Sequence, residues 1–292
     1  MDINRVLRRK IVVLDGAMGT ALIAKGYKDS LELLNVEAAD VVGSLHEEYL
    51  KAGADMVTTN TTCADALSLK EYGLAERSYE LSRAGAEVAR KAVDKYSTTE
   101  NPRFVAGAVG PTTRNITLAN DTTEEQLAEV YATQIKGLID GGVDLILIET
   151  AMDAANVRIA VEQVRKLSPE MPIIVSAVLS RLEGRVASGA TIAKFVEELP
   201  MEELLSVGFN CSMGDKQQAA ALKALSAVSN KPVVLYPALS QPQEAPNRFL
   251  KPLDTLMRAG GVNIIGGCCG TTPAHIEALA KAAARWRPRK IE

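Results

Sequence analysis

The sequence has few aromatic residues, no excess of charge of either sign and no long hydrophobic run. Its 33 lysine and arginine residues nearly balance 36 aspartate and glutamate residues, giving a formal net charge of −3, so its charge does not favour a nucleic-acid partner. No apolar run approaches the roughly 20 residues that a membrane span requires, and we expect no membrane association. The basic stretch 1–10 precedes only a short apolar run at 11–14. We therefore expect a cytoplasmic protein without a signal peptide.

Cysteine is also scarce, and its placement argues against a disulfide framework. The chain has four cysteines in 292 residues, whereas small secreted proteins that depend on disulfides carry them densely. Cys268 and Cys269 are adjacent, so a bond between them would be strained. A reducing cytosol disfavours that alternative, and reduced thiols are predicted.

Short, continuous apolar runs recur along the chain and alternate with helical stretches. They predict eight strands, at residues 11–14, 55–59, 104–109, 143–148, 173–178, 205–209, 232–236 and 262–265. Such runs are typical of parallel strands that are buried on both faces. The expected helices lie at 41–52, 64–92 with a break near Gly73, 123–141, 155–166, 192–198, 215–229, 252–259 and from Thr272 to about Trp286, with a surface loop at 240–247.

Strands and helices in this alternation predict a single-domain α/β fold, a (β/α)8 TIM barrel that spans residues 1–292. An open doubly wound sheet also alternates strands with helices, but no Gly-x-Gly-x-x-Gly pattern follows the first strand. In a barrel, the residues just past the strand ends face one pole, where active sites lie. The candidate site residues gathered by this rule are Asp15, Gly16, Asn60, Gly110, Glu149, Asn210, Cys211, Cys268 and Cys269.

Three of these candidates are thiols that suit a metal ion. Cys211 follows the sixth strand and the pair Cys268-Cys269 follows the eighth, so only one strand separates them around the barrel. Zn²⁺ suits three thiolates best, and three protein ligands leave its fourth position open, which is typical of a catalytic site. The sequence therefore predicts a zinc site formed by these three cysteines.

Other polar and thiol side chains are interpreted as structural. Cys63 is expected to be a small buried apolar residue. His46 lies on a helix beside two glutamates and is expected to be structural, while His275 is assigned no catalytic role, because the first turn of a helix disfavours a cation. Thr20, Asn60 and Thr150 could equally be loop-capping groups.

Several motifs together resemble the homocysteine S-methyltransferase family, most closely the homocysteine-binding module of cobalamin-dependent methionine synthase. The motifs are Asp15-Gly16-Ala17-Met18-Gly19-Thr20, Ala52-Gly53-Ala54-Asp55 leading to Thr59-Asn60-Thr61, Gly110-Pro111-Thr112, Ile148-Glu149-Thr150, Gly208-Phe209-Asn210-Cys211 and Gly266-Gly267-Cys268-Cys269-Gly270-Thr271-Thr272-Pro273. The resemblance implies that Cys211, Cys268 and Cys269 hold zinc and carry catalysis. It also implies that homocysteine is bound by Asp15, the amides of Gly16 and Ala17, Glu149 and Asn210.

The chemistry of thiols is consistent with this resemblance. A free thiol has a pKa of about 8.5 and is mostly protonated at neutral pH, whereas a metal ion deprotonates it. The thiolate would then displace a methyl group from its donor and become the thioether methionine. The chain has no further modules for folate, cobalamin or S-adenosylmethionine, and only 4% of its residues are aromatic, although cationic donors favour aromatic cages. We therefore expect a methyl-corrinoid protein as donor in trans.

Alternatives to this interpretation remain open. The donor could be a sulfonium such as S-methylmethionine or S-adenosylmethionine, or the protein could be a non-catalytic zinc- or thiol-binding subunit. Relatives usually have Pro-Asn-x-Gly after the seventh strand, whereas Ala238 stands at the asparagine position here. They commonly have Thr-Asn-Thr-Phe after the second strand, whereas Thr62 and Cys63 follow Thr61 here. Tyr236 or water could therefore occupy the fourth zinc position.

Overall fold

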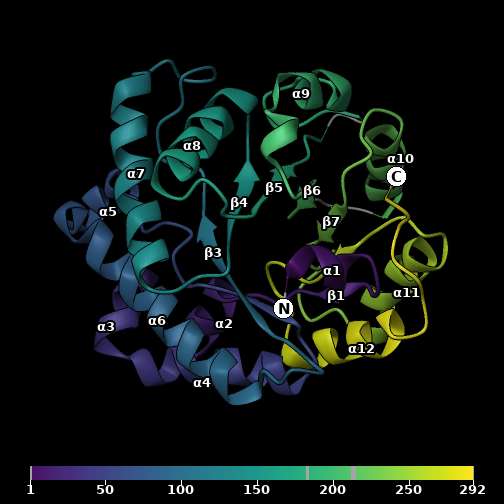
Figure 1. Ribbon diagram of the computed structural model, residues 1–292. Helices are drawn as coiled ribbons and strands as arrows, with labels where there is room; N and C mark the ends of the chain where they lie inside the picture. The colour runs from purple at the N-terminus through teal and green to yellow at the C-terminus, as the bar shows by residue number, and fades with distance from the viewer. Residues whose placement is uncertain (1, 182–183, 212–214, 292) are drawn as a thin grey trace.

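The strands form one parallel barrel enclosed by helices. The computed structural model describes residues 2–181, 184–211 and 215–291, so residues 212–214 of the predicted segment after the sixth strand lie outside the described residues. The strands are β1 (Val12–Val13), β2 (Met56–Thr58), β3 (Phe104–Val109), β4 (Leu145–Ala151), β5 (Ile173–Val178), β6 (Ser206–Asn210), β7 (Val233–Tyr236) and β8 (Ile264–Ile265). They pair in the order β1-β8-β7-β6-β5-β4-β3-β2 (Figure 1).

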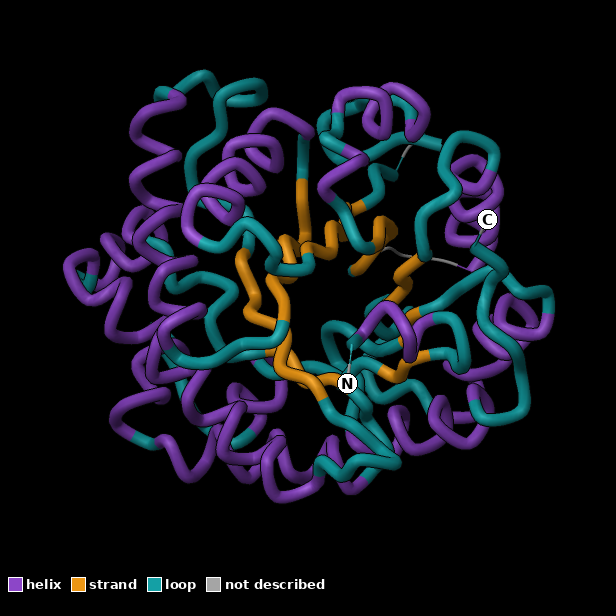
Figure 2. The backbone as a smooth tube through the Cα atoms, in the orientation of Figure 1, coloured by secondary structure: helices purple, strands orange, loops and turns teal. Residues whose placement is uncertain are grey.

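Backbone hydrogen bonds between β1 and β2 bring the two ends of this sheet together. The amide of Asp55 donates to Val13 O (2.7 Å) and the amide of Asp15 donates to Met56 O (2.9 Å). The predicted (β/α)8 barrel is therefore confirmed, and Figure 2 shows its ring of strands inside a ring of helices.

The helices follow the predicted alternation, with differences at their ends. They are α1 (Ile3–Leu7), α2 (Gly19–Ala24), α3 (Leu34–Glu37), α4 (Ala39–Lys51), α5 (Ala66–Leu69), α6 (Ser78–Tyr96), α7 (Glu124–Asp140), α8 (Ala154–Leu167), α9 (Ile192–Glu198), α10 (Asp215–Ser226), α11 (Pro246–Arg258) and α12 (Pro273–Ala283). The predicted capping box of Thr123 and Gln126 opens α7. The predicted start of a helix at Pro252 was wrong, because Pro246 occupies the first turn of α11 and Pro252 lies inside it. None of the helices in the described ranges is both long enough and apolar enough to cross a membrane.

The short helix α1 covers the amino-terminal end of the barrel. Ile3, Val6 and Leu7 are buried in one apolar cluster with barrel residues such as Met56 and Phe104. Figure 1 shows α1 lying across the ring of strands. Because this pole is filled, the carboxyl ends of the strands provide the open end at which a site can form.

His46 is buried in the helical layer without a hydrogen-bond partner. Its ring is on α4, fully buried, and neither ring nitrogen has a partner among the described residues. Burial lowers the pKa of His46 from 6.5 to about 4. The structural role predicted for this residue agrees with its position, and its ring stays neutral at pH 7.

We expect the His46→Leu variant to be less sensitive to acid than the parent protein. The unfolded chain protonates His46 near pH 6.5 and the folded chain only near pH 4, so the free energy of unfolding falls as the pH drops through this range. The substitution should reduce the loss of stability between pH 7 and pH 4 by about 3 kcal/mol. Chemical denaturation of both proteins at the two pH values would measure this difference. An identical pH dependence of the two proteins would contradict it.

Candidate metal centre and substrate cavity

The structure brings three cysteine thiols together at the carboxyl ends of the strands. Cys211 follows β6, and Cys268 and Cys269 follow β8. The Sγ atom of Cys269 lies 3.7 Å from that of Cys211 and 3.9 Å from that of Cys268. All three sulfur atoms lie within 4.8 Å of one another. The convergence inferred from the barrel topology is therefore present in the structure.

The spacing of these sulfur atoms fits a tetrahedral metal ion. With Zn–S bonds of about 2.3 Å, two ligands of a tetrahedral centre lie about 3.8 Å apart. All four cysteines of the chain are free, so the alternative of a vicinal disulfide between Cys268 and Cys269 is not present in this structure. The cluster consequently has the donor type and the spacing of a metal site, while its role as the ligand set stays a prediction.

Hydrogen bonds within the cluster divide its protons unequally. Hydrogen bonds from Cys211 and Cys268 lower the pKa of Cys269 below its usual range. Hydrogen bonding to Cys211 and Cys269, together with burial, raises the pKa of Cys268 well above its usual range. The thiols on their own therefore share protons, and a divalent cation would favour the loss of the remaining ones.

Neighbouring loops hold the loop of Cys268 and Cys269 tightly. The amide of Cys268 donates to Pro237 O (2.9 Å), and the amide of Gly267 donates to Asp15 O (3.0 Å). The Thr271 hydroxyl donates to Cys268 O (2.7 Å). A Cβ atom at Gly267 would lie 2.5 Å from Thr271 Oγ1, so this close approach requires glycine. The position of the two thiols is thus fixed by contacts with the ends of β1 and β7.

A cavity of about 320 Å³ opens beside the three thiols. Most of its wall comes from the loops that follow β1, β2, β4 and β8. The residues that line it are Leu14, Asp15, Gly16, Ala17, Met18, Gly19, Thr20, Ile23, Leu31, Glu32, Thr58, Thr59, Asn60, Thr62, Cys63, Glu149, Thr150, Cys211, Tyr236, Gly267, Cys268 and Cys269. Among these described residues three are carboxylic acids and none is basic, so the cavity suits a ligand with a cationic group.

Glu149 presents its carboxylate to this cavity from β4. Thr62 donates a hydrogen bond to Oε1 (2.7 Å), and the hydroxyl of Tyr236 donates to Oε2 (3.2 Å). The amide of Gly110 donates to Thr62 O (3.0 Å) and so helps to position Thr62. Burial raises the pKa of Glu149, and the charge of Cys269 raises it further. In this structure the Tyr236 hydroxyl serves Glu149, and a role for it at the fourth metal position stays a hypothesis.

Asp15 lies across the cavity from these groups and is anchored by the neighbouring strand. The Thr58 amide donates to its Oδ2 (2.8 Å) and the Thr58 hydroxyl to its Oδ1 (3.0 Å). Burial raises the pKa of Asp15 well above its usual range. Gly16 and Ala17 also line the cavity. The Ala17 amide, which was predicted to bind a substrate carboxylate, donates to Thr271 Oγ1 (3.1 Å).

Asn210 lies behind the cavity wall and does not line it. Its side chain is fully buried at the end of β6. It accepts a hydrogen bond from the Thr150 amide (3.0 Å) and donates one to Thr150 Oγ1 (2.8 Å). The Ser176 hydroxyl also donates to Asn210 Oδ1 (2.9 Å). The predicted contact of Asn210 with substrate therefore stays a prediction, and its contacts in the structure are with neighbouring strands.

The remaining polar candidates form local hydrogen bonds. Asn60 Nδ2 donates to Leu31 O (2.7 Å) and to Asn35 Oδ1 (3.0 Å). The amide of Gly270 donates to Thr20 Oγ1 (3.0 Å). For these side chains the loop-capping interpretation agrees with the observed contacts. His275 likewise interacts with protein groups, since its Nδ1 lies 2.9 Å from Thr272 Oγ1 and its Nε2 lies 2.8 Å from Glu244 O.

Cys63 was predicted to be a buried apolar residue, and this prediction was wrong. The residue is exposed and lines the cavity. The reason is that β2 ends at Thr58, after which the chain turns outward. Withdrawal of its sulfur from water inside the cavity and the nearby carboxylate of Glu32 raise the pKa of the Cys63 thiol to about 12. Cys63 consequently stays a protonated thiol, apart from the three-cysteine cluster.

Glu32 is a cavity residue that the sequence analysis missed. It is 8% exposed, accepts hydrogen bonds from the Cys63 amide (3.1 Å) and the Ser30 hydroxyl (3.2 Å), and has a pKa raised by burial. The available signal was an acidic residue within the apolar run Leu31-Glu32-Leu33-Leu34. Glu32 adds a second link between the loops after β1 and β2.

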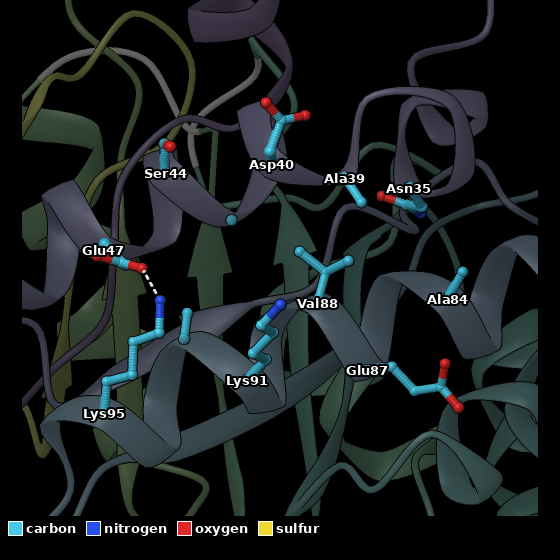
Figure 3. Close-up of a pocket in the computed structure, with 12 residues that line it drawn as sticks. Asn35, Ala39, Asp40, Ser44, Glu47, Ala84, Glu87, Val88, Lys91 and Lys95 are labelled. Atoms are coloured by element: carbon cyan, nitrogen blue, oxygen red, sulfur yellow. Dashed lines mark hydrogen bonds and ion pairs between the residues drawn. The ribbon is translucent and has the colours of Figure 1, made fainter.

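A larger hollow of about 500 Å³ lies outside the barrel, between α4 and α6. Figure 3 shows its lining, in which Lys95 forms an ion pair with Glu47 across the two helices. Charged side chains and small apolar ones such as Ala84 and Val88 alternate there, and none of its lining residues is a cysteine. The chemistry described above therefore belongs to the smaller cavity at the strand ends.

A barrel with converging thiols beside an acidic cavity defines an enzyme class whose substrates meet a thiol-bound metal ion at the strand ends. The family model for homocysteine S-methyltransferase matches residues 12–283. The chain belongs to the homocysteine S-methyltransferase family and is a methyltransferase, as its motifs predicted.

Solved structures of the homocysteine methyltransferase MmuM from Escherichia coli are similar to this chain. The oxidized form is 27% identical, with a TM-score of 0.79, over 93% of this chain and 95% of that chain. The metallated form is also 27% identical, with a TM-score of 0.78, over 94% of this chain and 96% of that chain. The apo form is 27% identical with a TM-score of 0.73, over 94% of this chain and 97% of that chain.

Proposed function

We propose that this protein transfers a methyl group to homocysteine and forms methionine at a zinc ion held by Cys211, Cys268 and Cys269. The observation that carries the proposal is the tetrahedral spacing of three thiols beside an acidic cavity. A donor set made only of thiolates favours zinc over the harder divalent ions. The free thiols suit the reducing cytoplasm. We further propose that residues 1–292 act as one homocysteine-binding domain.

The side chains of the cavity would hold homocysteine by its amino-acid end. Glu149 and Asp15 present buried carboxylates that suit the substrate ammonium. Bound zinc would supply the positive charge that lowers the pKa of the substrate thiol. In the reaction the thiolate sulfur forms a bond to the methyl carbon, while the bond between that carbon and the donor breaks and leaves its electron pair on the donor.

A methyl-corrinoid protein is the proposed donor. Tyr236 is the one aromatic residue among the described residues that line the cavity, and its hydroxyl donates to Glu149. The lining thus offers no aromatic cage for a cationic methyl donor. Cys269 is exposed, which gives a protein-bound donor access to the thiol cluster. The second candidate is a sulfonium such as S-methylmethionine or S-adenosylmethionine, and the acidic residues of the cavity favour it.

The donor can be identified by supplying each candidate separately to the zinc-loaded protein with homocysteine. We expect methionine with a methylated corrinoid protein, and no product when zinc is removed with a chelator. Product with a sulfonium alone would replace the corrinoid in the proposal. Homocysteine binding without product from any donor would instead identify a non-catalytic binding subunit.

A further inference from the structure

The strand that carries Glu149 is irregular at that residue. β4 pairs with β5 in regular register up to Ile148, and pairing resumes at Ala151 with a register shift. Thr150, inside the irregular segment, has a φ of +56°. β-branched residues rarely adopt this conformation, and it persists only where surrounding contacts maintain it. Bulges of this kind commonly redirect a side chain next to an active site.

The contacts that maintain this conformation come from Asn210. β5 lies between β6 and β4 in the barrel, so the Asn210 side chain reaches past β5 to contact Thr150. It engages both the amide and the hydroxyl of Thr150, at 3.0 and 2.8 Å. On the way it accepts a hydrogen bond from Ser176 on β5. A single amide side chain thus links three adjacent strands beneath the cavity.

We propose that Asn210 is a positioning residue that holds the irregular segment at Glu149 and Thr150, and so directs the Glu149 carboxylate into the cavity. This inference rests on the proposed role of Glu149 in binding the ammonium of homocysteine. Direct contact with substrate is a poorer account of Asn210, because its side chain is fully buried and does not line the cavity. Asn210 acts through Thr150, and the two residues should therefore be energetically coupled.

A double-mutant cycle tests that coupling. The readout is homocysteine affinity, measured by calorimetry on zinc-loaded protein without a donor. Asn210→Ala should weaken affinity about tenfold, as is typical when a supporting contact behind a site is lost. Glycine adopts positive φ freely, so adding Thr150→Gly should restore most of the affinity lost in Asn210→Ala. If the effects of the two substitutions simply multiply, Asn210 does not act through Thr150 and the proposal fails.

Zinc affinity provides a readout that needs neither substrate nor turnover. The Cys211 amide donates to Tyr236 O (3.4 Å) through the backbone, and a substitution of the Asn210 side chain leaves this bond in place. Competition with a chromophoric chelator should therefore show zinc affinity within about threefold of the parent protein, below the change expected for a group that supports a metal ligand. A larger loss of zinc affinity would assign Asn210 to the metal site and overturn the proposal. Because neither readout requires methionine formation, failure of the proposed function can be distinguished from failure of this inference.

Two serine variants complete the design. Ser176→Ala removes one hydrogen bond to Asn210 and should weaken homocysteine affinity in the same direction but less, which keeps the test valid if Asn210→Ala does not fold. Ser206→Ala is the matched control, because Ser206 is also fully buried but bonds Pro232 O (2.9 Å) at the other end of β6. It should leave homocysteine affinity unchanged. An equal loss in the two serine variants would indicate general damage to the barrel and contradict the proposal.

Discussion

Cys268→Ser is expected to abolish stable zinc binding and to lower the rate of methionine formation at least a thousandfold. Cys268 is central to the cluster, since its sulfur lies among the three that can share one ion and its loop is anchored on both sides. Serine has a much less acidic side chain and a harder donor atom, so it is a poor substitute for a thiolate. A thousandfold loss corresponds to about 4 kcal/mol of transition-state stabilisation.

Metal content and rate should be measured together on the same preparations. Cys63→Ser is the matched control for metal content, because Cys63 lines the same cavity but lies outside the three-sulfur cluster. Its zinc stoichiometry should equal that of the parent protein. Full zinc content and full turnover in Cys268→Ser would contradict the proposed site, and loss of zinc from Cys63→Ser would require a different ligand set.

The sequence could predict the barrel because its strands are continuous apolar runs, which few other environments accommodate. The same regularity allowed the thiols to be placed together, since residues after parallel strands share one pole. Helix ends were harder to predict. Both Pro246 and Pro252 are compatible with a helix start, and only the packing of α11 selects the first of them.

Side-chain direction at the strand ends could not be predicted from the sequence. Asn210 and Glu149 both follow apolar runs, yet one faces the strands beside it and the other faces the cavity. The register shift in β4 decides this difference, and it depends on contacts between residues 60 positions apart in the chain. Cys63 and Glu32 were misjudged or missed for the same reason, because loop conformation rather than hydrophobic pattern determines their exposure.

Glu149→Gln is expected to raise the KM for homocysteine about 10- to 150-fold, with a smaller effect on kcat. A hydrogen bond to a charged group contributes about 1.5–3 kcal/mol, which corresponds to this range. Glutamine can still accept from Thr62 or Tyr236, so the variant keeps the shape of the site and loses the charge. An interaction that holds substrate equally before and during the reaction affects KM more than kcat. Steady-state kinetics with homocysteine as the varied substrate would measure the change.

The pH dependence provides an independent check on the role of Glu149. Burial raises the pKa of this carboxyl, so the free enzyme should lose homocysteine affinity as the pH falls through a value above the usual range of glutamate. Glu149→Gln should lack this acid limb. Glu244→Gln is the matched control, because Glu244 is also buried and accepts the Ser240 amide (2.9 Å) but does not line the cavity. An acid limb that persists in Glu149→Gln, or a KM that rises equally in Glu244→Gln, would show that Glu149 does not bind the substrate ammonium.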